Sequence, residues 1–391
     1  MPVRTRLFVL VVSVPLVAFV LVGGFLGKAA AGDGGYRDLR VFEDVISLIL
    51  NNYVEQVEVD SVMEGALRGL AEGLDPDSAY LTPEQVVELQ SGPRQMGGVG
   101  LELTRQYYLR VVSARDGSPA AAAGLRTGDY LRAIDDQPTR PLSAWEGLRL
   151  LTGEPGTEVR LTVIRGNAAE PHEIVLRRAA PAAAMVTGRL EAPSTAYVRV
   201  SALGEGVASE LRDVLTRLER EGADRLILDL RGTALGDVDD GIDVARLFVS
   251  AGPVTLRRER GREDEPIVAS APASVALPTA LLISNGTAGA AEIVAAALQD
   301  HDVATLIGER TLGRVGDQAL VPLPNGGGLL MTTVRYTTPE GEAIFGEGVV
   351  PDQEVAEPVV EFGATPTDDP ILEAARTLLA EPAAAAAAAG A

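Results

Sequence analysis

The sequence predicts a mixed α/β protein of several domains, and three observations support this fold class. The chain has 391 residues, which is enough for two or three domains. Apolar residues recur at helical spacing in residues 36–90, whereas short strand-like segments fill residues 91–179. From residue 180 to 360 strands alternate with helices, a pattern typical of βαβ units and a mainly parallel sheet.

The first predicted element is an apolar helix at the N-terminus. Residues 7–26 carry no charge and follow Arg4 and Arg6, and their length matches one bilayer crossing. The positive-inside rule keeps the N-terminus in the cytoplasm. We therefore expect residues 1–32 to hold a single-pass transmembrane anchor in the cytoplasmic membrane, with the body on the periplasmic or extracytoplasmic side. The alternative is a signal peptide that is cleaved near the small residues 29–31.

Residues 36–90 are predicted to be a helical lead-in. Two apolar series at helical spacing support this: Val41, Val45, Ile46, Ile49 and Leu50, and then Val62, Leu67, Leu70 and Leu74. Residues 75–78 (DPDS) form a turn cluster. Thr82 as N-cap and Pro83 at the first helical position begin the next helix.

Residues 91–179 are predicted to form a domain of short strands with one helix. A glycine loop at 97–100 enters an alternating strand, and Ser143 with Glu146 forms a capping box that starts a helix ending near Leu151. Further strands are expected at 108–112, 130–134, 158–165 and 172–177. This arrangement resembles a PDZ domain, most closely from Gly98 to Asp135.

The PDZ resemblance implies a groove that binds peptide C-termini. Loop amides would hold the terminal carboxylate while the peptide adds as a strand, and Leu148 or Leu151 of the helix would meet a peptide side chain. The alternative is a structural domain with a blocked groove. Trp145 is interpreted as a packing residue. The expected peptide-binding residues of the loop and strand are Gly98, Val99, Gly100, Leu101, Glu102 and Leu103.

The remaining residues are predicted to form the α/β core, 180–360, and an acidic, alanine-rich tail, 361–391. Expected strands lie at 196–200, 225–230, 279–283 and 303–307, and expected helices at 206–221, 240–249 and 291–298. The charged stretch 257–265 (RRERGREDE) is interpreted as a solvated loop. Within the tail, residues 371–379 are expected to be helical.

Taken together, these segments resemble the carboxyl-terminal processing peptidases, or tail-specific proteases, over about residues 40–355. The matching pieces occur in the family's order: residues 74–81, the PDZ domain, LILDLR at 226–231, SNGTAGAAEI at 284–293, residues 308–318 and the closing strands at 332–352. The resemblance implies a core of the ClpP/crotonase-like kind and a serine nucleophile activated by a neutral lysine.

The chain departs from that family at both catalytic positions. Gly289 stands where the serine belongs, and Arg314 stands where the lysine belongs. Glycine cannot form an acyl-enzyme, and arginine does not deprotonate in proteins. Gln318, the family's supporting residue, is retained. On the oxyanion side, Leu235 replaces the first glycine of a turn, and Gly236 and Ala290 complete that set.

Other side chains near these positions give the alternatives. Thr287 and Ser284 are the nearest hydroxyls, and Thr287 is expected to point away from the nucleophile position. Asp317 is a candidate partner for Arg314. His301 is interpreted as a helix C-terminal cap and His172 as a surface strand residue.

Composition excludes several classes of function. With 34 Lys and Arg against 55 Asp and Glu, the net charge of −21 argues against nucleic-acid binding. No cysteine and two histidines exclude thiolate chemistry and Cys- or His-rich metal sites, so we expect no metal or cofactor.

Taken together, the N-terminal run, the PDZ resemblance and the residues at 289 and 314 favour a membrane-anchored, inactive pseudopeptidase that binds protein C-termini. The alternatives are an active serine-type endopeptidase with a displaced nucleophile and a non-binding scaffold, and the oligomeric state stays open.

Overall fold

The computed structural model describes most of the chain beyond residue 32. The apolar run at 7–26 and the last residues of the tail lie outside the described residues. Among the helices within the described part, none is both long and apolar enough to cross a membrane. The described ranges are 33–92, 97–166, 170–180, 185–191, 194–364 and 367–380.

The described residues fall into two compact units, which divide between Gly69 and Leu70. The first unit contains α2 (Asp33–Asn52) and most of α3 (Val59–Glu72). These two helices confirm the helical prediction for this part of the lead-in. The catalytic, oxyanion and peptide-binding candidates of the sequence all lie in the second unit.

The second unit opens on the predicted turn and then departs from the helical prediction. Asp75 Oδ1 accepts the amides of Asp77 and Ser78 at 3.0 and 2.8 Å. The turn leads into a short strand, β1 (Ala79–Leu81), before α4 (Pro83–Gln90), which has the expected Thr82 capping box. The strand exists because it pairs antiparallel with β16 (Gly328–Thr337), a partner that local sequence patterns do not reveal.

The PDZ domain is a sheet in the order β2-β3-β4-β6-β7, with β5 paired to β4. Its apolar side chains form one continuous cluster, and the capping box at Ser143 starts α6 as predicted. β2 is an edge strand of this sheet. The bounds are β2 (Leu101–Arg105), β3 (Leu109–Ala114), α5 (Pro119–Ala122), β4 (Tyr130–Ile134), β5 (Gln137–Pro138), α6 (Ala144–Leu151), β6 (Glu158–Ile164) and β7 (His172–Arg177).

The α/β core is built on a second sheet in the order β17-β14-β13-β10-β9-β8. All pairs from β17 to β9 are parallel, and only β8, which the sequence reading missed, runs antiparallel. The bounds are β8 (Val186–Glu191), β9 (Thr195–Val200), α7 (Val207–Arg220), β10 (Arg225–Asp229), α8 (Val238–Ala245), β13 (Thr279–Ile283), α9 (Ala290–Asp300), β14 (Ala304–Gly308), β17 (Gln353–Glu354) and α10 (Pro370–Ala380).

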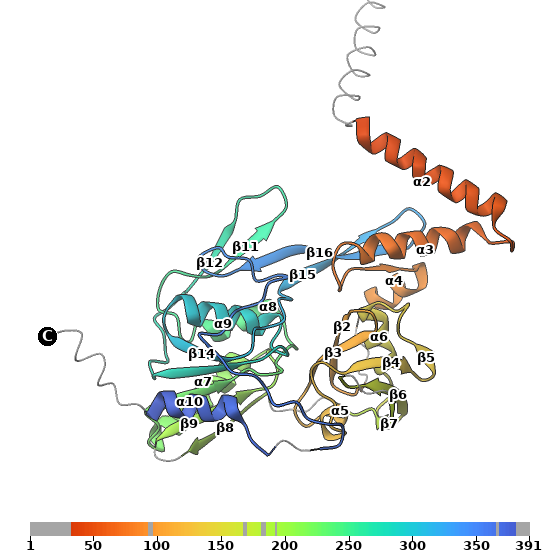
Figure 1. Ribbon diagram of the computed structural model, residues 1–391. Helices are drawn as coiled ribbons and strands as arrows, with labels where there is room; N and C mark the ends of the chain where they lie inside the picture. The colour runs from red at the N-terminus through yellow and green to blue at the C-terminus, as the bar shows by residue number, and fades with distance from the viewer. Residues whose placement is uncertain are drawn as a thin grey trace, which may run out of the picture. The chain divides into compact units, whose positions relative to one another are not determined.

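Helices cover both faces of this sheet (Figure 1). Leu226 and Leu228 of β10 pack in the cluster that contains α7, α8 and α9, whereas Ile227 packs against α10. Burial on both faces explains why β10 is a continuous apolar run rather than an alternating one. The helix α10 confirms the helical prediction for residues 371–379.

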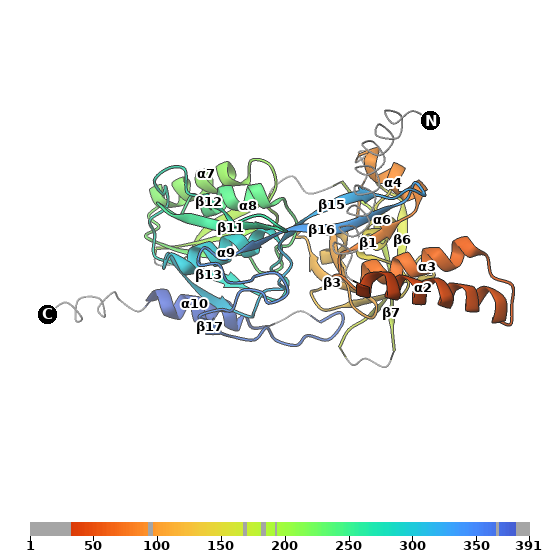
Figure 2. The same cartoon turned by 90° about the horizontal axis from the view of Figure 1, so that it is seen from above.

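A third sheet corrects the prediction of a solvated loop at 257–265. These residues are the end of β11 (Pro253–Glu259), a turn and the first residue of β12 (Glu265–Val268). Opposite charges pair there, as in Arg258 to Asp264 at 2.6 Å, so charged side chains occupy a two-stranded hairpin. The sheet order is β1-β16-β11-β12, and β15 (Gly316–Pro322) also pairs with β16. β16 thus links the lead-in strand β1 to the core hairpin (Figure 2).

Candidate functional site

Gly289, which is expected at the nucleophile position, lies at the N-terminus of α9. Gly289 is the N-cap, with φ 61° and ψ −127°, a conformation that strains residues with a side chain. A Cβ placed there would meet Ala234 O at 3.8 Å and Arg314 O at 3.9 Å, which are ordinary contact distances. The backbone therefore leaves room for a side chain that this residue does not have.

Glu292 fixes the geometry of this position, and the sequence reading did not identify it. Its buried carboxylate accepts the amides of Gly289 at 3.0 Å, Arg314 at 2.7 Å and Gly313 at 2.5 Å, and the Thr311 hydroxyl at 2.5 Å. Burial raises the pKa of Glu292 to about 7, although these donors act in the opposite direction. The one carboxylate therefore holds the backbones of Gly289 and Arg314 together. A glutamate at the third position of a helix was the available signal.

The side chain of Arg314 is committed to other partners. Its Nε donates to Asp77 Oδ2 at 2.6 Å, its Nη1 donates to Leu103 O at 2.9 Å, and Glu102 Oε2 lies 3.9 Å from Nη1. Burial acts to lower the pKa of Arg314, but the carboxylates of Asp77 and Glu102 raise it above its ordinary value. Burial in turn raises the pKa of Asp77, with Arg314 opposing the shift. A guanidinium in this environment stays cationic and cannot act as a base.

The predicted pairing of Arg314 with Asp317 was wrong. Asp317 Oδ2 instead accepts the Tyr336 hydroxyl at 2.7 Å within the β15–β16 pair. The prediction relied on closeness in sequence, whereas the real partner is 237 residues away in the lead-in turn. Gln318 supports that same turn, because its Nε2 donates to Asp77 O at 2.9 Å.

The two nearby hydroxyls are held in structural hydrogen bonds. Thr287 is fully buried, and its hydroxyl donates to Leu230 O at 2.8 Å. It also accepts the Ser284 amide at 3.0 Å. The Ser284 oxygen accepts the amides of Gly232 and Gly286, each at 3.2 Å. Both side chains stabilise the turn between β13 and α9.

The oxyanion-side residues lie in a loop beside α9. Leu203 N donates to Leu235 O at 2.8 Å. Gly236 has φ 136°, and a Cβ there would lie 1.7 Å from Leu203 O, so this position requires glycine. Ala290 is buried as the first residue of α9. The Leu235 carbonyl is thus used in a backbone hydrogen bond within the core. Leu235 also lines a cavity at the glycine loop of the PDZ domain.

That cavity, of about 280 Å³, lies at the predicted carboxylate loop. Gly98 corrects one expectation: its amide donates to Ala179 O at 2.9 Å and is not free for a ligand. Among the described residues, no hydrogen bond uses the amides of Val99 and Gly100. Gly100 has φ 78°, and a Cβ there would lie 2.3 Å from Ser118 Cβ. The loop therefore requires glycine at position 100 and has two backbone amides that could donate to a ligand. The lining includes Gly98, Gly100, Leu101, Arg115, Thr152 and Leu235.

On the opposite wall of the groove only one of the two leucines is accessible. Leu148 is partly buried, whereas Leu151 is 3 % exposed and packs in the domain core, so it cannot meet a peptide. Leu101 and Leu103 of β2 are also buried, so only their backbone lies at the edge of the sheet. Trp145 packs against the cluster of β1, α4 and β16, as a packing residue should.

The two histidines have structural positions. His301 is the C-cap of α9, as predicted, and its Nε2 lies 2.7 Å from Pro253 O. His172 begins β7 and stacks on Phe362 with ring centroids 4.4 Å apart. Within the described ranges, no three His, Cys, Asp or Glu residues are grouped as metal ligands would be.

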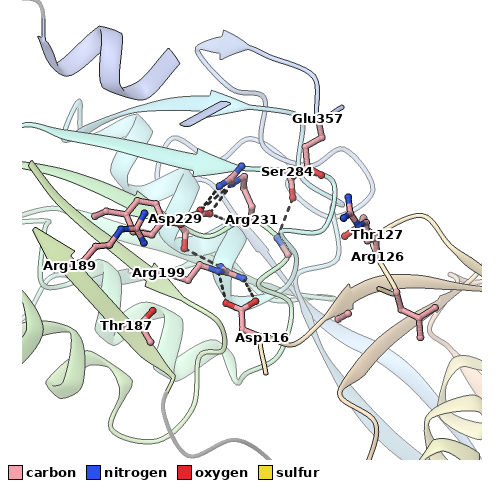
Figure 3. A pocket seen from close by; sticks show the side chains of 14 residues that line it. Asp116, Arg126, Thr127, Thr187, Arg189, Arg199, Asp229, Arg231, Ser284 and Glu357 are labelled. Atoms are coloured by element: carbon pink, nitrogen blue, oxygen red, sulfur yellow. Dashed lines mark hydrogen bonds and ion pairs between the residues drawn. The ribbon is translucent and has the colours of Figure 1, made fainter. Parts of the chain in front are cut away.

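A polar pocket of about 410 Å³ lies at the carboxyl ends of β9 and β10 and was not predicted (Figure 3). Arg231 pairs with Asp229 at 2.7 Å and Asp369 at 2.8 Å. Arg199 pairs with Asp116 at 3.0 Å. Burial raises the pKa of Asp229, but Arg231 and Arg199 outweigh it and hold the pKa below its ordinary value. These pairs join three carboxylates to two guanidinium groups, and Arg199 ties the PDZ domain to the core.

Comparisons with known proteins match both parts of the second unit. The model of peptidase family S41 matches residues 194–355, and a PDZ domain model matches residues 110–165. A carboxyl-terminal-processing protease of Synechocystis sp. is 34% identical over 296 residues, which cover 74% of this chain and 69% of that protein. A carboxy-terminal-processing protease of Bartonella bacilliformis is 31% identical over 334 residues, covering 83% and 77%. The solved structure of a photosystem II D1 C-terminal processing protease is similar with a TM-score of 0.68 at 28% identity, covering 86% of this chain and 90% of that one.

Proposed function

The chain belongs to the carboxyl-terminal processing proteases of peptidase family S41, and we propose that it is a pseudopeptidase that binds protein C-termini without cleaving them. The observation that carries the proposal is the pair of residues found where the family has its catalytic serine and lysine. Gly289 offers no nucleophile, and Arg314 is an ion-paired cation. In subtilisin, loss of the nucleophile alone lowers kcat by about 10⁶.

The retained part of the machinery supports the binding half of the proposal. The glycine loop has two amides with no partner in the described structure, beside a cavity that is large enough for a terminal carboxylate. β2 is an edge strand, so an extended peptide can pair with it. Because the pairing uses only backbone groups, peptides of many sequences could bind. The need for a free carboxylate at the loop amides would restrict binding to chain ends.

A displaced nucleophile has no support at the nearest hydroxyls. Thr287 and Ser284 both serve the turn before α9, and Arg314 cannot take a proton from either.

Peptide binding by the full chain tests the proposal. We expect peptides with an apolar C-terminus and a free carboxylate to bind with Kd in the micromolar range, about −8 kcal/mol, by isothermal titration calorimetry. The matched control is the same peptide with a C-terminal amide, which should bind at least tenfold more weakly. Equal binding of the two peptides would overturn the proposed C-terminus recognition.

We also propose that residues 1–32 anchor the protein in the cytoplasmic membrane with its body outside the cytoplasm. The uncharged run after Arg4 and Arg6 supports this. Membrane fractionation with N-terminal sequencing of the recovered chain tests it. An intact chain should remain with membranes after alkaline extraction, and a chain that begins near residue 32 would instead indicate cleavage.

A further inference from the structure

The contact of Arg314 with β2 bears on which C-termini the groove can accept. β2 is paired with β3 along one edge only. Arg314 Nη1 donates to Leu103 O at 2.9 Å, although Arg314 belongs to the loop before β15 in the core. A core side chain therefore occupies a hydrogen-bond acceptor of the PDZ strand.

The position of this acceptor follows from strand geometry. Gly100 O accepts the amide of Arg115, which continues β3, so Gly100 points its carbonyl toward β3. Backbone groups alternate between the two edges along a strand. The carbonyls of Leu101 and Leu103 then point to the free edge. The bulge between β2 and β3 leaves this alternation intact, because its extra residue, Val112, lies on β3.

A peptide bound by its C-terminus would meet these two carbonyls in turn. With the carboxylate at the amides of Val99 and Gly100, the amide of the last residue would reach Leu101 O. Backbone groups that face the same edge recur at every second residue of a strand. The amide of the third-from-last peptide residue would therefore reach Leu103 O. A peptide amide paired with Leu103 O would lie about 2.9 Å from that oxygen, and the guanidinium nitrogen of Arg314 already lies at 2.9 Å.

Arg314 is held firmly in this place. Its partner Asp77 is 9% exposed at the side chain, and Arg314 itself is 22% exposed. Moving the guanidinium away would leave a buried carboxylate without its cation, which is strongly unfavourable.

We propose that Arg314 shortens the peptide groove, so that backbone pairing reads only the last two residues of a bound C-terminus. This inference rests on the proposed function. It specifies the partner: a protein C-terminus whose third-from-last residue needs no free amide, so that proline is accepted there.

A backbone-methylated peptide tests the inference. A four-residue peptide with a free carboxylate is compared with the same peptide methylated at the amide of its third-from-last residue. For the full wild-type chain we expect the two Kd values to agree within twofold. For Asp77→Asn with Arg314→Met, which removes donor and carboxylate together, the unmodified peptide should bind about 3–10-fold more tightly, as one further hydrogen bond allows. The methylated peptide should not gain.

The control and the contrary results are distinct. Arg177→Met, an exposed arginine of β7 paired with Glu158, should leave both Kd values unchanged, and thermal unfolding checks that each variant is folded. A methylated peptide that binds the wild-type chain 3–10-fold more weakly than the unmodified one would overturn the inference but not the proposed function. Equal binding of amidated and free-carboxylate peptides to both chains would overturn the proposed function, and the inference with it.

Discussion

At the scale of single residues, Arg314 has a structural role at the meeting point of three segments. Its guanidinium joins the lead-in turn at Asp77, the PDZ strand at Leu103 and the core loop that carries it. A lysine has one nitrogen at its end, whereas the planar guanidinium donates in several directions at once. Arg314 therefore stabilises the junction that it occupies.

Removing Arg314 alone should be severely destabilising. Arg314→Ala leaves the buried carboxylate of Asp77 without its cation, and we expect a loss of about 3–5 kcal/mol in the free energy of unfolding. Asp77→Asn with Arg314→Ala should recover part of that loss, because no buried charge remains. Denaturant unfolding of both variants measures this. If the single and the double variant lose the same free energy, Asp77 and Arg314 are not coupled.

Glu102 should make the stability depend on pH. Burial raises its pKa from the usual 4.5 to about 7, with Arg314 lowering it and Asp77 raising it further. The folded state thus binds this proton more tightly than the unfolded state, and the stabilisation is full below pH 4.5 and lost as the pH rises through 7. Glu102→Gln should therefore gain about 1–3 kcal/mol relative to wild type at pH 8 and little at pH 4.5. An equal difference between the two proteins at both pH values would contradict the shift.

At the scale of elements, the carboxylate loop and the α9 turn each depend on a glycine with positive φ. Gly100 has φ 78° in the loop, and Gly289 has φ 61° at the N-terminus of α9. The two differ in the surrounding space. A Cβ at 100 collides with Ser118, whereas a Cβ at 289 meets nothing nearer than 3.8 Å.

Substitution in the loop should separate binding from general stability. Gly100→Ala combines an unfavourable φ with a contact of 2.3 Å, and we expect a loss of about 1–3 kcal/mol and no measurable peptide binding. Gly156→Ala is the matched control, because Gly156 also has a positive φ (91°), no atom lies within 4 Å of its Cβ position, and it does not line the cavity. Calorimetry and thermal unfolding report the two effects. Peptide binding that survives Gly100→Ala would place the carboxylate elsewhere.

At the scale of the whole molecule, the local pattern of apolar residues predicted most helices and strands. It missed strands that form only by pairing with a segment distant in sequence. The parallel strands and their helices were predictable because burial on both faces leaves continuous apolar runs. β1 was missed because this short strand forms by pairing with β16, and the β11–β12 hairpin was missed because its charged sequence resembles a loop, whereas β11 pairs with both β12 and β16.

The candidate site shows the same division. The glycine at 289 and the arginine at 314 could be read from the sequence, and the resemblance to the peptidases predicted that these are the nucleophile and base positions. The partners of Arg314 could not, because Asp77 and Leu103 reach it only through the folding of three separate segments. The burial of Leu151 likewise depends on how α6 faces its sheet.

The most direct test of the central claim is proteolysis. The full chain is incubated with an unfolded protein that has an apolar C-terminus, and products are followed by mass spectrometry. Beside it runs Gly289→Ser with Arg314→Lys and Asp77→Asn, which restores both dyad residues and removes the carboxylate that would hold the lysine charged. We predict that the wild-type chain leaves the substrate intact and that the triple variant cleaves it. Cleavage by the wild-type chain that is abolished by Thr287→Ala or Ser284→Ala would contradict the account.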